Sequence, residues 1–311
     1  MIKKNKQNNK GKISIIIPLA VGKKLDYSNK NNNLKIIIKE GDNPSKNRNS
    51  GVKETKTELI AFTNGHTYIP DNWYENVTNF FRENPQVDIV GGPQLTPKNS
   101  SLFERASGYA LGSIFGAGGV KSRYSGKKLF LNADETMLTS ANLVCKKKVF
   151  EKIKFDESLY PGEDPKFIND AKKEGFIVAY SPNIVVHNKR RTTIDELSKQ
   201  IFGYGKTRPE KENFFETLKK PFFIIPSLFL FYLIILLIYI TYKLLNNQTV
   251  NLFFVLPLII YVLLNLIFSL VNSIKNKDFL AIFLLPEIYF VIHVSYGLGF
   301  ITSTLKKQRR S

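Results

Sequence analysis

The pattern of apolar and polar positions changes near residue 220. Before this point, short apolar runs alternate with polar turns, whereas residues 221–305 are apolar for almost their whole length. A helix of ~20 apolar residues crosses the hydrocarbon core of a bilayer. Three stretches here have about that length: 221–242, 250–272 and 279–302. The pattern therefore predicts a polar domain, then a membrane region at 216–305 and a basic tail at 306–311.

The polar part reads as alternating strands and helices. Apolar runs bounded by turn residues predict four strands: 13–18, 34–41, 58–63 and 87–92. Helical patterns follow at 45–57, 71–81 and 165–174. Alternation of this kind predicts a mostly parallel sheet with helices on both faces, which binds ligands at the carboxyl ends of its strands. We expect one α/β domain at 12–215, preceded by a disordered basic segment at 1–11.

The charge distribution bears on partners and on orientation. The 311-residue chain has 45 Lys and Arg against 26 Asp and Glu, and most of its net charge of +19 falls on residues 1–220. We assign this charge to contact with anionic lipid headgroups rather than to nucleic acid. Lys219 and Lys220 precede the first apolar stretch, whereas the loop after it is nearly neutral. The polar domain is therefore expected on the cytoplasmic side.

The third apolar stretch leaves its topology open. Three complete crossings would put the basic tail outside, against the tendency of positive charges to stay inside. This stretch also contains Pro286, Glu287 and His293, which are unusual in a simple span. A re-entrant or interfacial segment is the alternative, and it would keep both chain ends in the cytoplasm.

Two neighbouring carboxylates are the most informative chemical feature. Glu163 and Asp164 follow Gly162 at the predicted start of a helix. Carboxylates at that position gain about 0.3–1 kcal/mol from the helix dipole, so helix capping is the plain structural explanation. The alternative is general acid–base chemistry, because a paired carboxylate has a raised pKa.

Six segments follow one another along the chain: ISIIIP, KIIIKEGDNPSKNRNSGVKET, ELIAFTNGHTYIP, GGPQLTP, the FDESLYPGED block and KQIFGYGKTR. Together they resemble family 2 glycosyltransferases of the GT-A fold that carry C-terminal transmembrane helices. The resemblance covers about residues 12–208. It implies inverting transfer of a sugar from a nucleotide-diphosphate sugar to an acceptor hydroxyl, here a lipid-linked or cell-surface polysaccharide acceptor at the cytoplasmic face.

The resemblance also implies roles for single residues. Asp164 would be the general base, with Glu163 positioning the acceptor beside it. Gln200 and Tyr204 would lie on the acceptor side. The donor would be bound by residues from several segments: Glu40, Arg48, Asn64, His66 and Arg208.

The chain departs from the family pattern at Asn64-Gly65-His66. Relatives typically have an acidic metal-binding motif at this point, whose carboxylates hold Mg²⁺ or Mn²⁺ against the donor diphosphate. An amide and an imidazole are poorer ligands for a hard cation. Three outcomes stay open: His66 with His187 binds a softer ion such as Mn²⁺, basic side chains replace the metal, or the domain is a catalytically impaired homologue that acts as a scaffold or glycan-binding protein.

Overall fold

The computed structural model describes residues 12–23, 25, 31–211 and 217–308. The expected disorder of residues 1–11 lies outside this range. Contacts divide the chain into two compact units. The first unit comprises the described residues up to Leu95 together with Ser122–Lys189, and the second comprises Thr96–Lys121 with the described residues from Arg190 onward. Each unit is described by itself.

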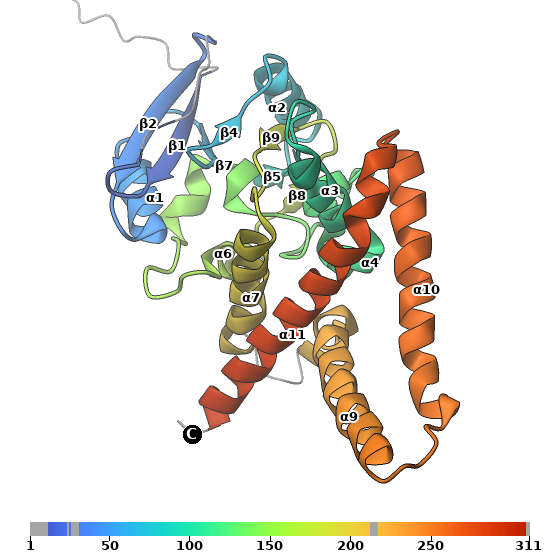
Figure 1. Ribbon diagram of the computed structural model, residues 1–311. Helices are drawn as coiled ribbons and strands as arrows, with labels where there is room; N and C mark the ends of the chain where they lie inside the picture. The colour runs from blue at the N-terminus through green and yellow to red at the C-terminus, as the bar shows by residue number, and fades with distance from the viewer. Residues whose placement is uncertain (1–11, 24, 26–30, 212–216, 309–311) are drawn as a thin grey trace, which may run out of the picture. The chain divides into compact units, whose positions relative to one another are not determined.

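The first unit is built on a six-stranded mixed sheet (Figure 1). Its strands in spatial order are β2 (Leu34–Glu40), β1 (Ile13–Leu19), β3 (Leu59–Phe62), β7 (Leu143–Lys146), β5 (Ile89–Gly91) and β8 (Val178–Tyr180). Only β7 runs antiparallel to its neighbours among these six. A second, three-stranded sheet consists of β4 (Thr67–Tyr68), β9 (Val186–Asn188) and β6 (Gln94–Leu95).

Helices cover both faces of the larger sheet, because successive side chains of a strand point to opposite faces. One core packs Ile16 and Phe62 against Phe167 of α6 (Glu163–Lys173), with Val52 of α1 (Pro44–Lys53) beside it. The opposite core packs Ile15 and its neighbours against the buried side of α2 (Trp73–Glu83). The predicted α/β class with a mostly parallel sheet and flanking helices is confirmed.

Shorter elements complete the first unit: α5 (Ser122–Ser125) and the 3₁₀ turns η2 (Ser140–Asn142) and η3 (Lys147–Glu151). The strand β7 was not predicted from the sequence. Its residues LVCK follow small polar residues, and the strand is three-quarters buried in the centre of the sheet. Helix α1 begins one residue earlier than expected and ends at Lys53, and its cap is Asn43, whose side chain accepts from Lys46 N at 3.0 Å.

In the described residues of the second unit, the regular elements are helices and 3₁₀ turns, joined by loops (Figure 1). Its elements from the middle of the chain are α3 (Leu102–Leu111), α4 (Ile114–Ala117) and the 3₁₀ turn η1 (Gly118–Lys121). From the C-terminal part come α7 (Ile194–Lys211), η4 (Pro221–Phe223), α9 (Ile225–Leu245), α10 (Leu252–Lys275), η5 (Phe279–Phe283) and α11 (Leu285–Gln308).

Three helices of this unit, α9, α10 and α11, are long and apolar enough to cross a membrane. They match the three apolar stretches that the sequence predicts. The sequence predicted one domain over residues 12–215, but the contacts divide this range. Helices α3 and α7 pack with α11 and so belong to the helical unit.

Candidate active site

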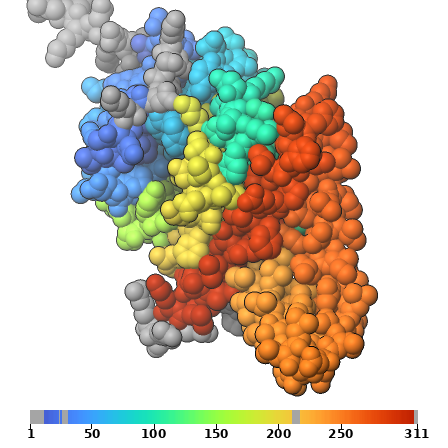
Figure 2. All heavy atoms as spheres, in the orientation of Figure 1, coloured from blue at the N-terminus to red at the C-terminus, as the bar shows by residue number. Residues whose placement is uncertain are grey.

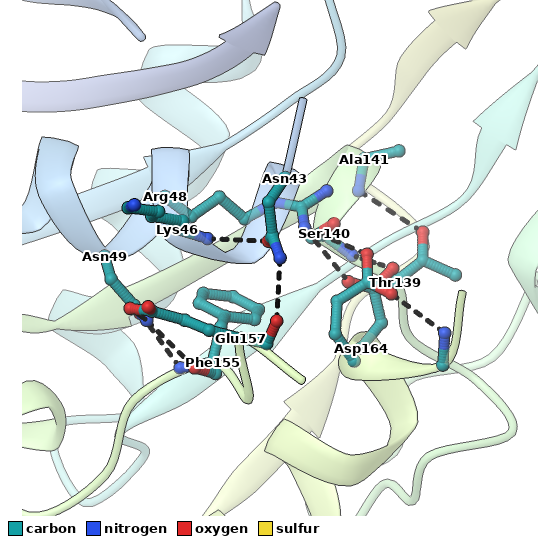
Figure 3. Close-up of polar contacts among 12 residues, drawn as sticks. Asn43, Lys46, Arg48, Asn49, Thr139, Ser140, Ala141, Phe155, Glu157 and Asp164 are labelled. Atoms are coloured by element: carbon teal, nitrogen blue, oxygen red, sulfur yellow. Dashed lines mark hydrogen bonds and ion pairs between the residues drawn. The ribbon is translucent and has the colours of Figure 1, made fainter. Parts of the chain in front are cut away.

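The carboxylates at the start of α6 face Arg48 of α1 (Figure 3). The Arg48 Nη1 atom lies 3.0 Å from Glu163 Oε1 and 4.0 Å from Asp164 Oδ1. The side chains of Arg48 and Glu163 are only 5% and 6% exposed, whereas that of Asp164 is 19% exposed. One buried guanidinium therefore serves two neighbouring carboxylates, and Asp164 is the carboxylate that solvent reaches.

The two carboxylates have different hydrogen-bond partners. Both oxygens of Glu163 are engaged, because Oε1 accepts from Arg48 and Oε2 accepts from Gly162 N at 2.8 Å. Asp164 Oδ2 accepts from Ser140 N at 3.0 Å. An ionised carboxylate oxygen has two lone pairs, so Oδ2 can accept a second hydrogen bond. The Asp164 side chain is also the more exposed of the two, so it is better placed than that of Glu163 to take up a proton from a bound molecule.

The Glu163 carboxyl has a shifted pKa. Burial and the negative charge of Asp164 raise the pKa of this group, and Arg48 partly opposes the rise. This combination is expected where two acids share a site that excludes water. Helix capping, the plain alternative from the sequence, accounts for only part of the Glu163 contacts: its side chain accepts from the N–H of Gly162 at the start of α6, and it also accepts from Arg48.

Helix α1 also holds the loop that leads to the carboxylates (Figure 3). Asn49 exchanges two hydrogen bonds with the backbone of Phe155: Nδ2 donates to its carbonyl at 2.9 Å, and Oδ1 accepts from its N–H at 3.0 Å. Asn43 Nδ2 donates to the carbonyl of Glu157 at 2.7 Å. The Arg48 guanidinium lies 5.3 Å from the centre of the Phe155 ring. These contacts fix the start of α6 relative to α1.

The residues Thr139–Asn142 belong to the site, and the sequence interpretation missed them. Ser140 supplies the backbone donor for Asp164. Asn142 donates to the carbonyls of Pro93 and Ile184, at 3.3 and 2.6 Å, and accepts from Trp73. A signal was present, because small polar residues directly before an apolar run of three are typical of a turn entering a buried strand.

The neutral turn at Asn64–His66 connects β3 to β4. Thr63 Oγ1 donates to the carbonyl of Ala141 at 3.2 Å, so the turn begins beside η2. In the adjoining strands Tyr68 is paired with His187, and their rings are 6.1 Å apart. His66 and His187 therefore lie near the same pair of strands, as a shared metal would require.

The ligand types at this turn do not suit a hard divalent ion. The described residues contain no group of three or more His, Cys, Asp or Glu side chains that could hold a metal. The turn itself offers only an amide and an imidazole, whereas Mg²⁺ prefers carboxylate oxygens. We therefore derive no step of the reaction through a metal ion.

The other predicted donor and acceptor residues have these positions. Glu40 closes β2, and its Oε1 accepts from Gly22 N at 2.8 Å. In the helical unit, Gln200 Nε2 donates to the hydroxyl of Tyr204 at 3.0 Å along α7. Arg208 is 4% exposed, and its guanidinium lies 3.8 Å from the centre of the Phe223 ring.

A hollow of about 540 Å³ lies on the other side of α6. Its walls come from residues 152–158 and from the later turns of α6, including Lys166 and Asp170. None of the predicted site residues lines it. We place the chemistry at Asp164, because a hydrogen bond from Ser140 N fixes the position of its carboxylate and Oδ2 can still accept a second hydrogen bond. The hollow is instead lined by charged residues of both signs.

A family model matches the first half of the chain. Residues 24–154 match the model of "Glycosyl transferase family 2". This match supports a family 2 glycosyltransferase domain. Over 294 residues this glycosyltransferase is 25% identical to the Methanococcus voltae protein named dolichyl N-acetyl-α-D-glucosaminyl phosphate 3-β-D-2,3-diacetamido-2,3-dideoxy-β-D-glucuronosyltransferase. That match covers 93% of this chain and 84% of its relative. The chain is thus an enzyme of the glycosyltransferase class with apolar C-terminal helices.

Two solved structures resemble the chain. TarS 1–349 of S. aureus in complex with UDP-GlcNAc has a TM-score of 0.41 and 13% identity, and the match covers 62% of this chain and 65% of TarS 1–349. The mannosyltransferase PcManGT of Pyrobaculum calidifontis, in complex with GDP-Man and Mn²⁺, has a TM-score of 0.41 and 10% identity. That match covers 62% of each chain. The glycosyltransferase thus spans less than two thirds of the length of either structure.

Proposed function

We propose that this glycosyltransferase transfers a sugar, with inversion at the anomeric carbon, from a nucleotide-diphosphate sugar to a lipid-linked acceptor. The observation that carries the proposal is the Asp164 carboxylate, held by Ser140 N and Arg48 with one lone pair of Oδ2 open. The M. voltae relative is named for an acceptor carried on a dolichyl phosphate, which supports a lipid-linked acceptor over a free polysaccharide.

Asp164 would act as the general base. An alcohol is a poor nucleophile, so a carboxylate within ~3 Å of the acceptor hydroxyl lowers the barrier by taking its proton as the new glycosidic bond forms. The bond from the sugar to the diphosphate breaks on the opposite side, and the leaving diphosphate takes the electron pair. Glu163 would contribute by holding Arg48 in place, since both of its oxygens are already bonded.

Charge on the leaving diphosphate would be stabilised by donors near the carboxyl ends of the strands. Asn64 and His66 are proposed to contact the donor there, in place of the acidic residues of related enzymes. Glu40 would accept a hydrogen bond from the nucleoside. Arg48 is less suited to bind the donor than the sequence predicted, because its Nη1 atom lies 3.0 Å from Glu163.

The reaction would take place on the cytoplasmic side. Nucleotide sugars are charged and do not cross a bilayer unaided, and Lys219 and Lys220 directly precede the first apolar helix. A lipid-linked acceptor lies in the membrane plane, so anchoring the enzyme beside it raises the effective concentration of the acceptor.

The test uses the full chain purified in detergent with a panel of nucleotide sugars and a polyprenyl phosphate-linked sugar. At least one donor should give a product whose new linkage is inverted by NMR. We expect Asp164→Asn to lower the transfer rate by about 10²–10⁴-fold, the usual contribution of a general base. Its melting temperature should stay within a few degrees of the parent value, because Asn keeps the bond from Ser140 N. Full activity of Asp164→Asn would refute the assignment of the base.

An impaired homologue that binds a glycan is the second candidate, and the neutral turn at Asn64–His66 favours it. Calorimetry separates the two functions. Saturable binding of a nucleotide sugar, with or without Mn²⁺, supports the transferase. Binding of a glycan without any binding of a nucleotide sugar supports the scaffold.

A further inference from the structure

The third apolar helix, α11, differs from the two before it. In the most apolar 18 residues of each helix, the share of residues buried within the structure is 6% for α9 and 11% for α10. For α11 this share is 44%. Helices α9 and α10 thus present apolar surface on nearly all sides, as helices in lipid do. Most of one side of α11 is instead covered by protein.

Helix α7, which carries several charged side chains, lies along the C-terminal half of α11 (Figures 1 and 2). Ser198 of α7 is hydrogen bonded to Ser295 at 2.9 Å, and Lys307 Nζ donates to the carbonyl of Pro209 at 2.7 Å. The members of these pairs are 97 and 98 residues apart in sequence, so the two helices run side by side in the same direction.

Glycines bring the two backbones into contact. A Cβ atom added to Gly205 of α7 would lie 2.2 Å from the carbonyl oxygen of Tyr296, and one added to Gly299 would lie 2.2 Å from that of Phe202. Contacts this close leave no room for lipid between the helices. The residues from Ser295 to Lys307, about 20 Å of helix at 1.5 Å per residue, are therefore bound to α7.

Helix α7 cannot lie in hydrocarbon. Its residues Asp195 and Lys199 form an ion pair of 2.6 Å with side chains 68% and 74% exposed, and Glu196 next to them is also exposed. Each charged side chain at the centre of a bilayer costs at least about 2.5–3.5 kcal/mol. Because α7 must stay in water or headgroups, the half of α11 bound to it must stay there too.

The midpoint of α11 lies at the start of α9. A Cβ atom added to Gly297 would lie 2.5 Å from the carbonyl oxygen of Pro226, in the first turn of α9. A spanning helix would have its midpoint about 15 Å deep, at the centre of a ~30 Å hydrocarbon core. The start of α9 is instead the point at which the chain enters the membrane.

Beyond the first turn of α11, where Glu287 is exposed, the open side of the helix is apolar. Phe290, Leu298 and Leu305 are 43%, 47% and 55% exposed, and they lie within an arc of about 80° at 100° per residue. Gly299, which contacts α7, lies about 100° beyond Leu298 around the helix, and Ser295 lies about 60° beyond it. A helix with water-exposed charges behind it and a narrow apolar stripe in front has the geometry of an interfacial helix.

We propose that α11 lies along the membrane surface with the stripe of Phe290, Leu298 and Leu305 against the lipid acyl chains. Only α9 and α10 then cross the bilayer. Two crossings return the chain to its starting side, so Lys306 and Lys307 lie on the same side as Lys219 and Lys220. This arrangement removes the conflict with the positive-inside tendency that three crossings create. It does not depend on the reaction that the enzyme catalyses.

The test places single cysteines in the full chain and labels them in sealed membrane vesicles of both orientations with an impermeant maleimide. Cys145 is fully buried and gives the background signal. Lys306→Cys should react from the same side as Glu174→Cys in the first unit, and from the opposite side to Thr249→Cys between α9 and α10. Labelling of Lys306→Cys from the side of Thr249→Cys would overturn the proposal.

If labelling is incomplete, a measurement of how deep α11 lies in the bilayer tests the proposal independently. Spin labels at Phe290→Cys, Leu298→Cys and Leu305→Cys should show the same depth, within about one helix radius of each other, by accessibility to oxygen and to a nickel complex. A spanning α11 would separate the depths at 290 and 305 by about 22 Å. A graded depth along these three positions would contradict the proposal, whatever side the tail is on.

Discussion

The start of α6 and the turn after β3 lie in the same α/β unit, and both fall where family 2 glycosyltransferases have acidic residues. At the start of α6 the acids are present, and they are bonded to Arg48, to the backbone N–H of Ser140 and to the backbone N–H of Gly162. At the turn, the acids are replaced by Asn64 and His66. In the proposed reaction, the chain has kept the group that would take a proton from the acceptor while changing the group that would face the leaving diphosphate.

This difference teaches that the two halves of the reaction place separate demands on the protein. A general base must have a fixed position and an open lone pair, and the Asp164 carboxylate is proposed to have both. Stabilising a leaving diphosphate needs positive charge or hydrogen-bond donors, which amide, imidazole and backbone groups also supply. A neutral turn is therefore compatible with transfer, provided that the start of α6 stays intact.

The largest expected effect comes from removing the shared cation. Arg48→Met leaves Glu163 and Asp164 buried without their counter-charge, and breaking one partner of a buried ion pair costs about 3–5 kcal/mol. Chemical denaturation should show a loss of this size, and transfer should fall with it. Arg48→Lys, which restores the charge but not the fork of donors, should recover part of the stability. A stability loss below about 1 kcal/mol in Arg48→Met would show that the cluster does not hold the site together.

A smaller loss is expected where α1 holds the loop before α6. Asn49→Ala removes both hydrogen bonds to the backbone of Phe155, each of which contributes about 0.5–1.5 kcal/mol. The control is Asn76→Ala, because Asn76 makes one exposed bond to the carbonyl of Asn183. Equal denaturation midpoints for the two variants would contradict a special role of α1.

The raised pKa of Glu163 predicts a pH dependence of stability. A carboxyl whose pKa is higher in the folded chain binds more protons when folded, so the free energy of unfolding falls as pH rises above the unfolded pKa of about 4.3. Glu163→Gln removes this group. Melting temperatures from about pH 4 to about pH 7 should therefore fall more steeply for the parent chain than for Glu163→Gln. Parallel curves would show that the carboxyl has the same pKa in both states.

The smallest effect is expected at the neutral turn. The double variant Asn64→Asp with His66→Asp restores two charged oxygen ligands, so Mg²⁺ or Mn²⁺ should stimulate it more strongly than the parent chain. We expect less than about tenfold change in the metal-free transfer rate of this variant, because Asp164 is unaltered. Donor titrations with and without EDTA measure the response, and an identical response in both proteins would show that this turn does not contact the diphosphate.

The sequence predicted the strands and helices of the first half of the fold, because they follow the periodicity of buried side chains. The run of isoleucines in β1 and the pattern of α2 are local features of this kind. The antiparallel strand β7 was missed, since its four residues are too few to show a period and its position depends on pairing with β3 and β5.

The site was predictable only in part, for a related reason. A carboxylate pair after Gly162 is visible in the sequence, but its partners come from residues 24 and 115 positions away. Ser140 contributes a backbone N–H, which has no signature in the side chains. The family resemblance pointed to Asp164, and the tertiary contacts then showed that Asp164 and Glu163 have different partners.

The central claim is tested most directly by one side-by-side measurement of transfer rates at saturating donor and acceptor. Asp164→Asn and His66→Ala are compared with the parent chain in the same detergent preparation. The account predicts a loss of about 10²–10⁴-fold for Asp164→Asn and of less than about tenfold for His66→Ala. The reverse order, with His66→Ala inactive and Asp164→Asn close to the parent, would contradict it.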